Sequence, residues 1–244
     1  MKGRKVISES DLVELRRLIK DKFRFKYDPF EFMWTDYDGE PIDEYSLLDI
    51  PEVSDVRCGC SKAVLFLSYL DDYVIKLPFL GREDGIDDDE PAWFKHALIE
   101  ESDSEYEGWD YCRVEEAIYK KACDQGVEEL FCGTRYLCSF GGFPIYVSEK
   151  SDAALCEDNW AHCSSRDGLD YIRSKRKSSS SDFLDCLNDM EDSTIGMFYD
   201  SWGKETTDKF LDFLVDNNVR DCHNGNVAFK DGRIRVIDYS SFDV

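Results

Sequence analysis

The chain has 244 residues, of which 53 are acidic and 30 basic, so its formal net charge at pH 7 is −23. This charge argues against nucleic-acid binding through a generic basic surface. A hydrophobic content of 42% and an aromatic content of 14% argue against a globally disordered chain. The length predicts one or two domains, and no stretch approaches the ~20 consecutive apolar residues that a membrane span requires.

The ten cysteines and three histidines do not form a recognisable metal-binding pattern. No two cysteines make a C-x-x-C pair, and three histidines give poor support for a zinc site. Residues 1–20 carry an amphipathic helix pattern and lack the apolar block of a secretory signal. We therefore expect reduced, mostly buried thiols in a cytoplasmic protein, with neither a membrane nor nucleic acid as a partner.

The part of the chain that follows this helix predicts strands. Up to residue 50 it is aromatic and loop-rich. Two apolar β-type runs, at 63–68 and 73–77, are separated by a short polar segment that indicates a hairpin turn. Residues 83–107 contain eleven acidic residues, so we expect a solvated acidic insertion there.

The middle of the chain predicts one helix and one hairpin. Apolar residues recur at helical spacing over 110–125, and Gly126 stands where a helix C-terminal cap belongs. Runs at 134–140 and 143–149 flank Gly141-Gly142, a two-residue hairpin signal.

Beyond the hairpin we expect a polar loop and a second helix. Residues 157–182 are polar, which is typical of a loop, and 206–217 has the apolar periodicity of a helix with Thr206 as its N-cap.

The end of the chain predicts a tight hairpin. Asp231-Gly232 is a type I′ turn signal between two alternating runs. The resulting register pairs Lys230 with Arg233 and Val227 with Val236. Four apolar residues then share one face, as a half-buried hairpin requires: Val227, Phe229, Ile234 and Val236.

The same register brings Asn226 beside Asp238 at the open end of the hairpin. Two oxygen-bearing side chains at this point suit Mg²⁺, which takes one or two protein ligands and completes its octahedron with water and phosphate oxygens. Asp221 lies five residues before Asn226, in the loop that leaves the preceding helix. Each of these residues is also common in ordinary turns.

This stretch resembles the catalytic loop of the protein-kinase-like superfamily. Asp221 and Asn226 match the D-x-x-x-x-N spacing, and Asp238 matches the aspartate of D-F-G. The local sequence is similar to the D-x-H-x-G-N form of aminoglycoside-phosphotransferase-like kinases, and most similar to the short kinases of some bacteriophages. Val219 replaces the family histidine, and Tyr239-Ser240 replaces Phe-Gly.

The resemblance continues upstream. Lys76, at the end of an apolar strand, is similar to the lysine of V-A-I-K, although a solvent-facing strand lysine is the simpler interpretation. The segment before it lies where the phosphate-covering glycine-rich loop belongs. Only Gly59 of that motif is present, and Ser61 is expected to offer its hydroxyl to phosphate.

Two glutamate positions complete the expected nucleotide site. In the family, a glutamate of the helix after the lysine pairs with it, and Glu115 or its neighbour Glu116 occupies that position here, with Glu115 preferred. Glu149 ends the strand that would lead into the adenine-binding hinge.

The resemblance implies an α+β, bilobal, protein-kinase-like fold. Residues 1–150 would form the N-terminal helix and an N-lobe with an antiparallel sheet, interrupted by the 83–107 insertion. Residues 151–244 would form a reduced, mostly helical C-lobe with the catalytic loop and the metal-binding hairpin. Six residues follow Asp238, so the acceptor-binding surface is expected to come from other segments or from a partner.

The implied activity is that of an ATP- and Mg²⁺-dependent kinase, in particular a protein serine/threonine kinase. Asp221 would accept the proton of the attacking hydroxyl, and Lys76 would contact the phosphates. Asn226 and Asp238 would hold the metal. The acceptor would be a protein or a small molecule.

Two other functions remain open at this point. A pseudokinase-like binding protein would keep the nucleotide cleft for structure and use its acidic surface to engage a basic partner. A DNA-mimic inhibitor would follow from the charge alone, but it requires ordered rows of carboxylates.

Overall fold

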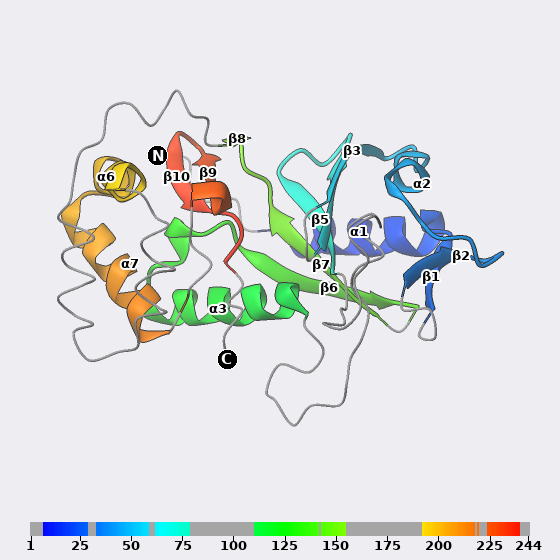
Figure 1. Ribbon diagram of the computed structural model, residues 1–244, viewed down its shortest axis with the longest axis horizontal. Coiled ribbons are helices and arrows are strands. Elements are labelled where there is room, and N and C mark those ends of the chain that lie inside the picture. Colours follow the sequence, from blue (N-terminus) through cyan, green and yellow to red (C-terminus); the bar gives the residue numbers. More distant parts are fainter. Residues whose placement is uncertain are drawn as a thin grey trace, which may run out of the picture. The chain divides into compact units, whose positions relative to one another are not determined.

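The computed structural model describes residues 7–28, 33–58, 62–78, 110–141, 143–154, 192–217, 219 and 224–239. The protein is α+β with antiparallel sheets, as expected (Figure 1). It divides into two compact units, described separately below. Unit 1 comprises Met1–Arg113 and Thr134–Glu149, and unit 2 comprises Val114–Gly133 and Lys150–Val244.

Unit 1 is built on a five-stranded antiparallel sheet in the order β3-β4-β5-β7-β6. The strands are β3 (Val53–Cys58), β4 (Lys62–Leu67), β5 (Tyr73–Pro78), β6 (Thr134–Phe140) and β7 (Phe143–Glu149). The two predicted hairpins, β4–β5 and β6–β7, are confirmed. Strand β3 was not predicted, because among its residues 53–57 only Val53 and Val56 are buried apolar side chains.

The predicted N-terminal helix is α1 (Glu9–Lys22). It begins at a capping box, in which the Ser8 hydroxyl accepts the amide of Asp11 at 3.1 Å and the Asp11 carboxylate accepts the amide of Ser8 at 3.2 Å. The buried face of α1 joins one core with the apolar face of the sheet. Arg16 adds a hydrogen bond from its side chain to the Leu137 carbonyl at 2.8 Å.

The expectation of a loop-rich segment up to residue 50 was wrong. This segment forms a two-stranded sheet, β1 (Phe25–Asp28) and β2 (Met33–Asp36), and the short helix α2 (Glu44–Leu48). Its aromatic residues are core residues: Phe25 packs against Phe23 and Trp34 with ring centroids 4.8 and 5.3 Å apart. Burial of these aromatic side chains stabilises the two-stranded sheet. It depends on a partner distant in sequence, because Phe23 and Phe25 also pack against Phe140.

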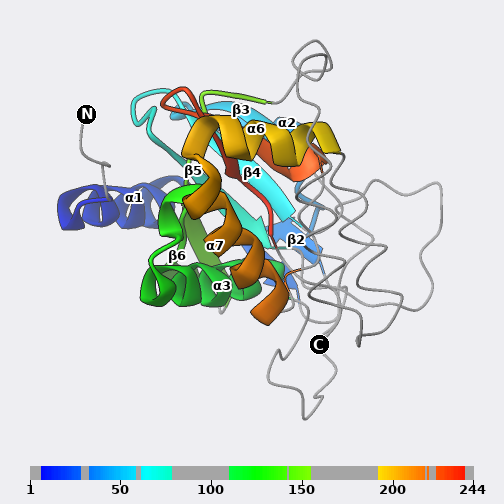
Figure 2. The same cartoon turned by 90° about the vertical axis from the view of Figure 1, so that its left-hand side faces the viewer.

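Unit 2 contains the helices α6 (Asp192–Trp202) and α7 (Lys204–Asp216) and most of α3 (Tyr111–Gln125). Helix α3 and its Gly126 cap, at φ +71°, confirm the prediction. Figure 2 shows α6 and α7 as consecutive helices that meet at an angle. Helix α7 starts two residues earlier than predicted, and its N-cap is Gly203 rather than Thr206. Gly203 adopts φ +77°, a conformation that glycine reaches without strain.

The C-terminal hairpin β9 (Val227–Lys230) and β10 (Arg233–Val236) has the predicted register. Both turn residues have positive φ, 53° for Asp231 and 73° for Gly232, as a type I′ turn requires. The expectation of a half-buried hairpin was wrong, because Ala228 and Arg235 on the second face are buried as well. A third strand, β8 (Ala153–Ala154), pairs with β9, and the Trp202 indole of α6 donates to the Ile234 carbonyl at 2.7 Å.

An aromatic cluster forms the centre of unit 2. The ring of Phe131 lies 5.5 Å from both Phe210 and Phe213 of α7 and 4.9 Å from Tyr239, measured between centroids. Phe131 follows the short 3-10 helix η2 (Glu128–Leu130). Across the described ranges of both units, no helix combines the length and apolar character needed to cross a membrane.

Candidate functional site

The second face of the unit 1 sheet carries buried polar side chains. Residues directly opposite each other on neighbouring strands project from the same face, and so do residues two apart on one strand. Lys76 lies opposite Val64 on one side and Tyr146 on the other, which assigns all three to the face away from α1. This polar face also includes further buried polar residues: Lys62, Thr134 and Ser148. Buried polar groups on a sheet face are a functional signal, because burying them is unfavourable unless they are paired.

Lys76 occupies the central strand of this face and is only 4% exposed. Its Nζ donates to the Thr134 hydroxyl at 3.5 Å, and Thr134 donates in turn to the Ser148 hydroxyl at 3.2 Å. The structure therefore rules out the simpler interpretation of a solvent-facing strand lysine. A buried ammonium beside two hydroxyls provides charge and hydrogen-bonding groups for an anion.

Asp110, the residue before α3, contacts the polar face through Tyr146. One carboxylate oxygen accepts the Arg113 amide at 3.0 Å, which caps the helix, and the other accepts the Tyr146 hydroxyl at 2.6 Å. Burial raises the pKa of this carboxyl from 3.8 to about 6, against the lowering effect of the hydrogen bond from Tyr146. Sequence analysis missed Asp110, which could have been recognised only as a helix N-cap.

The two candidate glutamates of α3 differ in burial. Glu115 is fully buried, whereas Glu116 is partly exposed. A fully buried carboxylate requires hydrogen-bonding or ionic partners, so the burial favours Glu115 as the residue with an internal role. Glu149, the last residue of β7, is partly exposed at the strand end, opposite Tyr73 of β5.

The open end of the hairpin in unit 2 brings Asn226 and Asp238 together through the backbone. The Asn226 carbonyl accepts the amide of Ile237 at 2.8 Å and that of Asp238 at 3.4 Å. Both residues are partly exposed. The predicted adjacency of Asn226 and Asp238 is therefore confirmed.

Tyr239 anchors the chain immediately after Asp238. Its side chain is fully buried, and its hydroxyl donates to the Cys132 carbonyl at 3.0 Å. The Cys132 amide donates to the Val236 carbonyl at 2.8 Å, so the segment is attached on both sides of Asp238. Sequence analysis treated Tyr239 only as a departure from D-F-G, and its aromatic character was the available signal for a buried anchor.

Other predicted site residues lie outside the described residues. These are Asp221, Gly59 and Ser61, together with the 83–107 insertion. Within the described ranges, no three His, Cys, Asp or Glu side chains gather as a metal-binding group. The predicted Mg²⁺ site has one amide and one carboxylate ligand, and a site of that kind is compatible with this finding.

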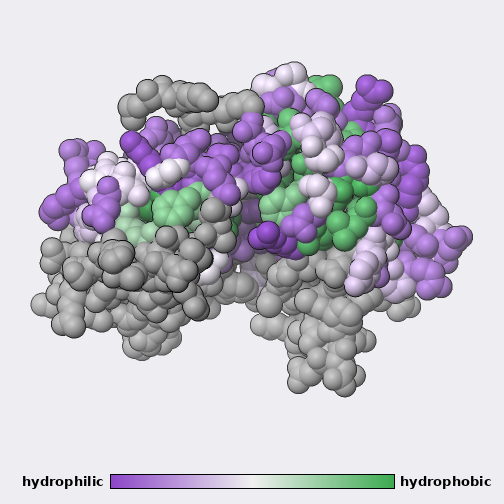
Figure 3. Space-filling model, turned by 90° about the horizontal axis from the view of Figure 1, so that it is seen from above, coloured by the Kyte–Doolittle hydropathy of each residue, from purple (hydrophilic) through white to green (hydrophobic). Residues whose placement is uncertain are grey.

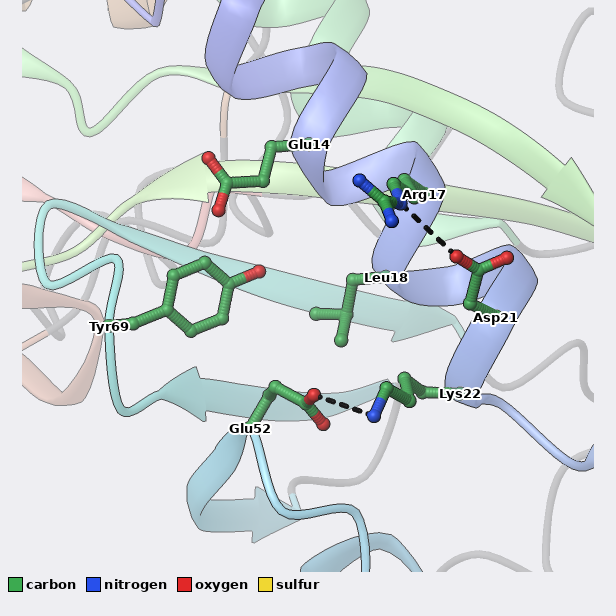
Figure 4. Close-up of a pocket in the computed structure, with 7 residues that line it drawn as sticks. All are labelled: Glu14, Arg17, Leu18, Asp21, Lys22, Glu52 and Tyr69. Atoms are coloured by element: carbon green, nitrogen blue, oxygen red, sulfur yellow. Dashed lines mark hydrogen bonds and ion pairs between the residues drawn. The ribbon is translucent and has the colours of Figure 1, made fainter.

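A separate surface hollow of about 360 Å³ lies beside α1 in unit 1 (Figure 4). Its walls carry two ion pairs, Arg17 with Asp21 at 3.3 Å and Lys22 with Glu52 at 3.0 Å. Leu18 and Tyr69 complete the lining with Glu14. None of the polar-face residues lines this hollow, and exposed ion pairs of this kind contribute little energy. Figure 3 shows that hydrophilic residues also cover much of the described surface on the face that it presents.

No protein family model matches the chain, and no curated protein matches its sequence significantly. The support for a function therefore comes from the residues of the polar face and of the C-terminal hairpin.

Proposed function

We propose that the chain is a kinase that transfers the γ-phosphoryl group of ATP, with Mg²⁺, to a hydroxyl of a protein or small molecule. The observation that carries this proposal is Lys76, a buried lysine on the central strand of a polar sheet face. Lysine is a preferred phosphate ligand when it is held in a defined place, and the two hydroxyls beside it provide further hydrogen bonds.

The hairpin of unit 2 supplies independent support. Its backbone pairing brings Asn226 and Asp238 next to each other, and an amide and a carboxylate are ligands that Mg²⁺ bound to nucleotide phosphates can use. In this proposal, Asn226 and Asp238 hold the metal. Unit 1 serves as the N-lobe and unit 2 as the reduced C-lobe of a bilobal, cytoplasmic kinase.

The reaction requires little covalent chemistry from the protein. The acceptor oxygen forms a bond to the γ-phosphorus while the bond to the β–γ bridging oxygen breaks, and ADP leaves. Asp221 takes the proton of the acceptor hydroxyl. In this proposal Lys76, kept in place by Glu115, neutralises charge on the phosphates, and Mg²⁺ held by Asn226 and Asp238 would supply further neutralisation there; such charge neutralisation is the main source of acceleration in phosphoryl transfer.

The test compares two aspartates of one hairpin. Asp238→Asn removes the metal-binding charge with minimal change in shape, whereas Asp231→Asn changes an exposed turn aspartate to a residue that tolerates its positive φ. Incubation with γ-labelled ATP and Mg²⁺ should give ADP release or autophosphorylation in the wild type and the Asp231 variant. The Asp238 variant should fall to background. Equal background turnover in all three proteins would end the kinase proposal.

A pseudokinase-like binding protein is the second candidate. Only Gly59 remains of the glycine-rich motif, and the net charge of −23 suits a basic partner. This function predicts nucleotide binding without turnover, so a binding measurement beside the same assay separates the two candidates.

A further inference from the structure

The surface hollow beside α1 has no part in the functions considered so far. One wall is a face of α1 that includes Glu14 and Leu18, and the other consists of Glu52 and Tyr69 at one end of the β3–β4 pair (Figure 4). The Ser68 amide donates to the Glu52 carbonyl at 2.9 Å, which keeps Glu52 and Tyr69 at the same end of the sheet. The hollow of about 360 Å³ therefore has walls from two elements of unit 1 that share one core.

The charged side chains of the hollow carry an excess of one negative charge. Three of them are carboxylates and two are cations, and both cations belong to the ion pairs described above. Glu14 is the remaining carboxylate. Across the part of the chain that the structure describes, it has no hydrogen bond and no ion pair. A guest with one positive charge therefore neutralises the lining, whereas an anion adds to its excess charge.

Tyr69 provides an aromatic surface next to this carboxylate. Tyr69 is 42% exposed, and Figure 4 shows the Glu14 carboxylate extending from α1 toward its side chain. Burial raises the pKa of the Tyr69 hydroxyl, and the charges of Glu14 and Glu52 raise it further, which agrees with both carboxylates lying near the ring. A carboxylate beside an aromatic ring binds a cation by a charge-assisted hydrogen bond together with a cation–π contact.

This lining suits a guanidinium group better than an ammonium group. A guanidinium group is planar, stacks on an aromatic ring and donates paired hydrogen bonds to a carboxylate, and it is less strongly hydrated than an ammonium group. Leu18 adds an apolar contact for the aliphatic stem of an arginine side chain.

The sequence around the hollow favours a protein segment as the source of this group. Residues 27–56 contain ten acidic residues and no basic one, and Glu52 of this stretch lines the hollow. An acidic surface of this kind attracts a segment with several positive charges through long-range electrostatics. A protein segment rich in arginine therefore fits both the hollow and its surroundings.

We propose that the hollow beside α1 binds an arginine side chain of a basic protein partner, with Glu14 as the carboxylate that pairs with the guanidinium group and Tyr69 as the ring on which it stacks. Neither residue takes part in the proposed phosphoryl transfer. The docking site and the kinase activity can therefore fail independently of each other.

The test is the binding of a fluorescent peptide of alternating arginine and glycine to the full chain, followed by anisotropy. Peptides of the same length with lysine or citrulline in place of arginine are the comparison, because citrulline keeps the shape of arginine without its charge. We expect the arginine peptide to bind most tightly, the lysine peptide roughly threefold more weakly, and the citrulline peptide not at all.

Matched variants separate a contact in the hollow from the effect of net charge. Glu14→Gln and Glu9→Gln each remove one negative charge from an exposed position of α1, but only Glu14 lines the hollow. Glu14→Gln should raise the dissociation constant of the arginine peptide roughly 3- to 10-fold, and Glu9→Gln by less than about twofold. Tyr69→Leu should weaken binding roughly 2- to 5-fold, whereas Tyr69→Phe keeps the ring and should match the wild type.

Three results would overturn the proposal. Equal weakening by Glu14→Gln and Glu9→Gln would mean that the peptide responds to net charge alone. Equal affinity for the arginine and citrulline peptides would mean that the charge is not recognised. Free arginine amide binding as tightly as the peptide would indicate a small-molecule site in place of a protein partner.

A measurement on the unaltered chain covers variants that do not fold. Addition of the arginine peptide should shift the backbone amide NMR signals of Leu18 and Tyr69, which line the hollow, and leave that of Arg57 near the far end of β3 unchanged. Unchanged signals for Leu18 and Tyr69 at saturating peptide would refute binding in the hollow.

Discussion

Replacing Asp110 by asparagine should remove a pH-dependent destabilisation of unit 1. The Asp110 carboxyl has a pKa of about 6 in the folded chain and an ordinary value of 3.8. Between these values the folded state binds more protons than the unfolded state, so the free energy of unfolding falls as the pH rises. Above about pH 7 the carboxyl is ionised in both states and the destabilisation is complete.

The magnitude follows from the two pKa values. At about 1.4 kcal/mol for each pKa unit, the difference between 3.8 and about 6 amounts to roughly 3 kcal/mol at pH 8. About half of this is already present at pH 5, so a change of roughly 1.4 kcal/mol is expected between pH 5 and 8. Asparagine can keep both contacts, because its oxygen accepts the Arg113 amide and its amide group donates to the Tyr146 hydroxyl.

The assay is urea denaturation of wild type and Asp110→Asn from pH 5 to 8, with amide hydrogen exchange in β7 as the report on unit 1. Starting at pH 5 avoids the acid range where so acidic a chain loses its net charge and aggregates. The stability of the variant minus that of the wild type should rise by about 1.4 kcal/mol across this range. Asp38→Asn, at an exposed position of unit 1, serves as the control for the loss of one surface carboxylate. A flat difference for Asp110→Asn would refute the reasoning that burial raises this pKa.

Two further predictions concern the framework of unit 2. Tyr239→Phe removes the hydrogen bond to the Cys132 carbonyl and keeps the buried ring. We therefore expect the free energy of unfolding to fall by about 1 kcal/mol in urea denaturation followed in unit 2. An unchanged midpoint would mean that the hydroxyl contributes nothing to stability. Gly203→Ala adds a methyl group that meets no other atom, but at a backbone φ of +77°. Backbone strain alone should therefore lower the free energy of unfolding by about 1–2 kcal/mol. A neutral or stabilising result in the same assay would contradict the assignment of Gly203 as the N-cap of α7.

Local chemistry explains which features the sequence could predict. The hairpin register follows from Asp231-Gly232, because a type I′ turn determines which residues lie opposite each other. The adjacency of Asn226 and Asp238 follows from that register without knowledge of any distant contact. The helix over 110–125 was predictable for the same reason, since its apolar periodicity and its Gly126 cap are both local.

Features that depend on distant partners were not predictable. Lys62 and Asp110 are buried by tertiary packing, and nothing in their sequence neighbourhoods distinguishes them from surface residues. The two-residue strand β8 is too short to leave a periodic signal. Arg235 is buried on the second face of the hairpin, which no alternation of apolar residues indicates.

The attachment of Tyr239 bears on how strongly the metal site proposed above could hold its ion at the neighbouring aspartate. The Val236 carbonyl and the Tyr239 hydroxyl, on either side of Asp238, are both hydrogen-bonded to the Cys132 backbone, so little conformational freedom would remain to be lost when a cation binds. Affinity then reflects mainly the exchange of water for carboxylate and amide oxygens. Loosening that tether should raise the dissociation constant of the ion even though every ligand atom is retained.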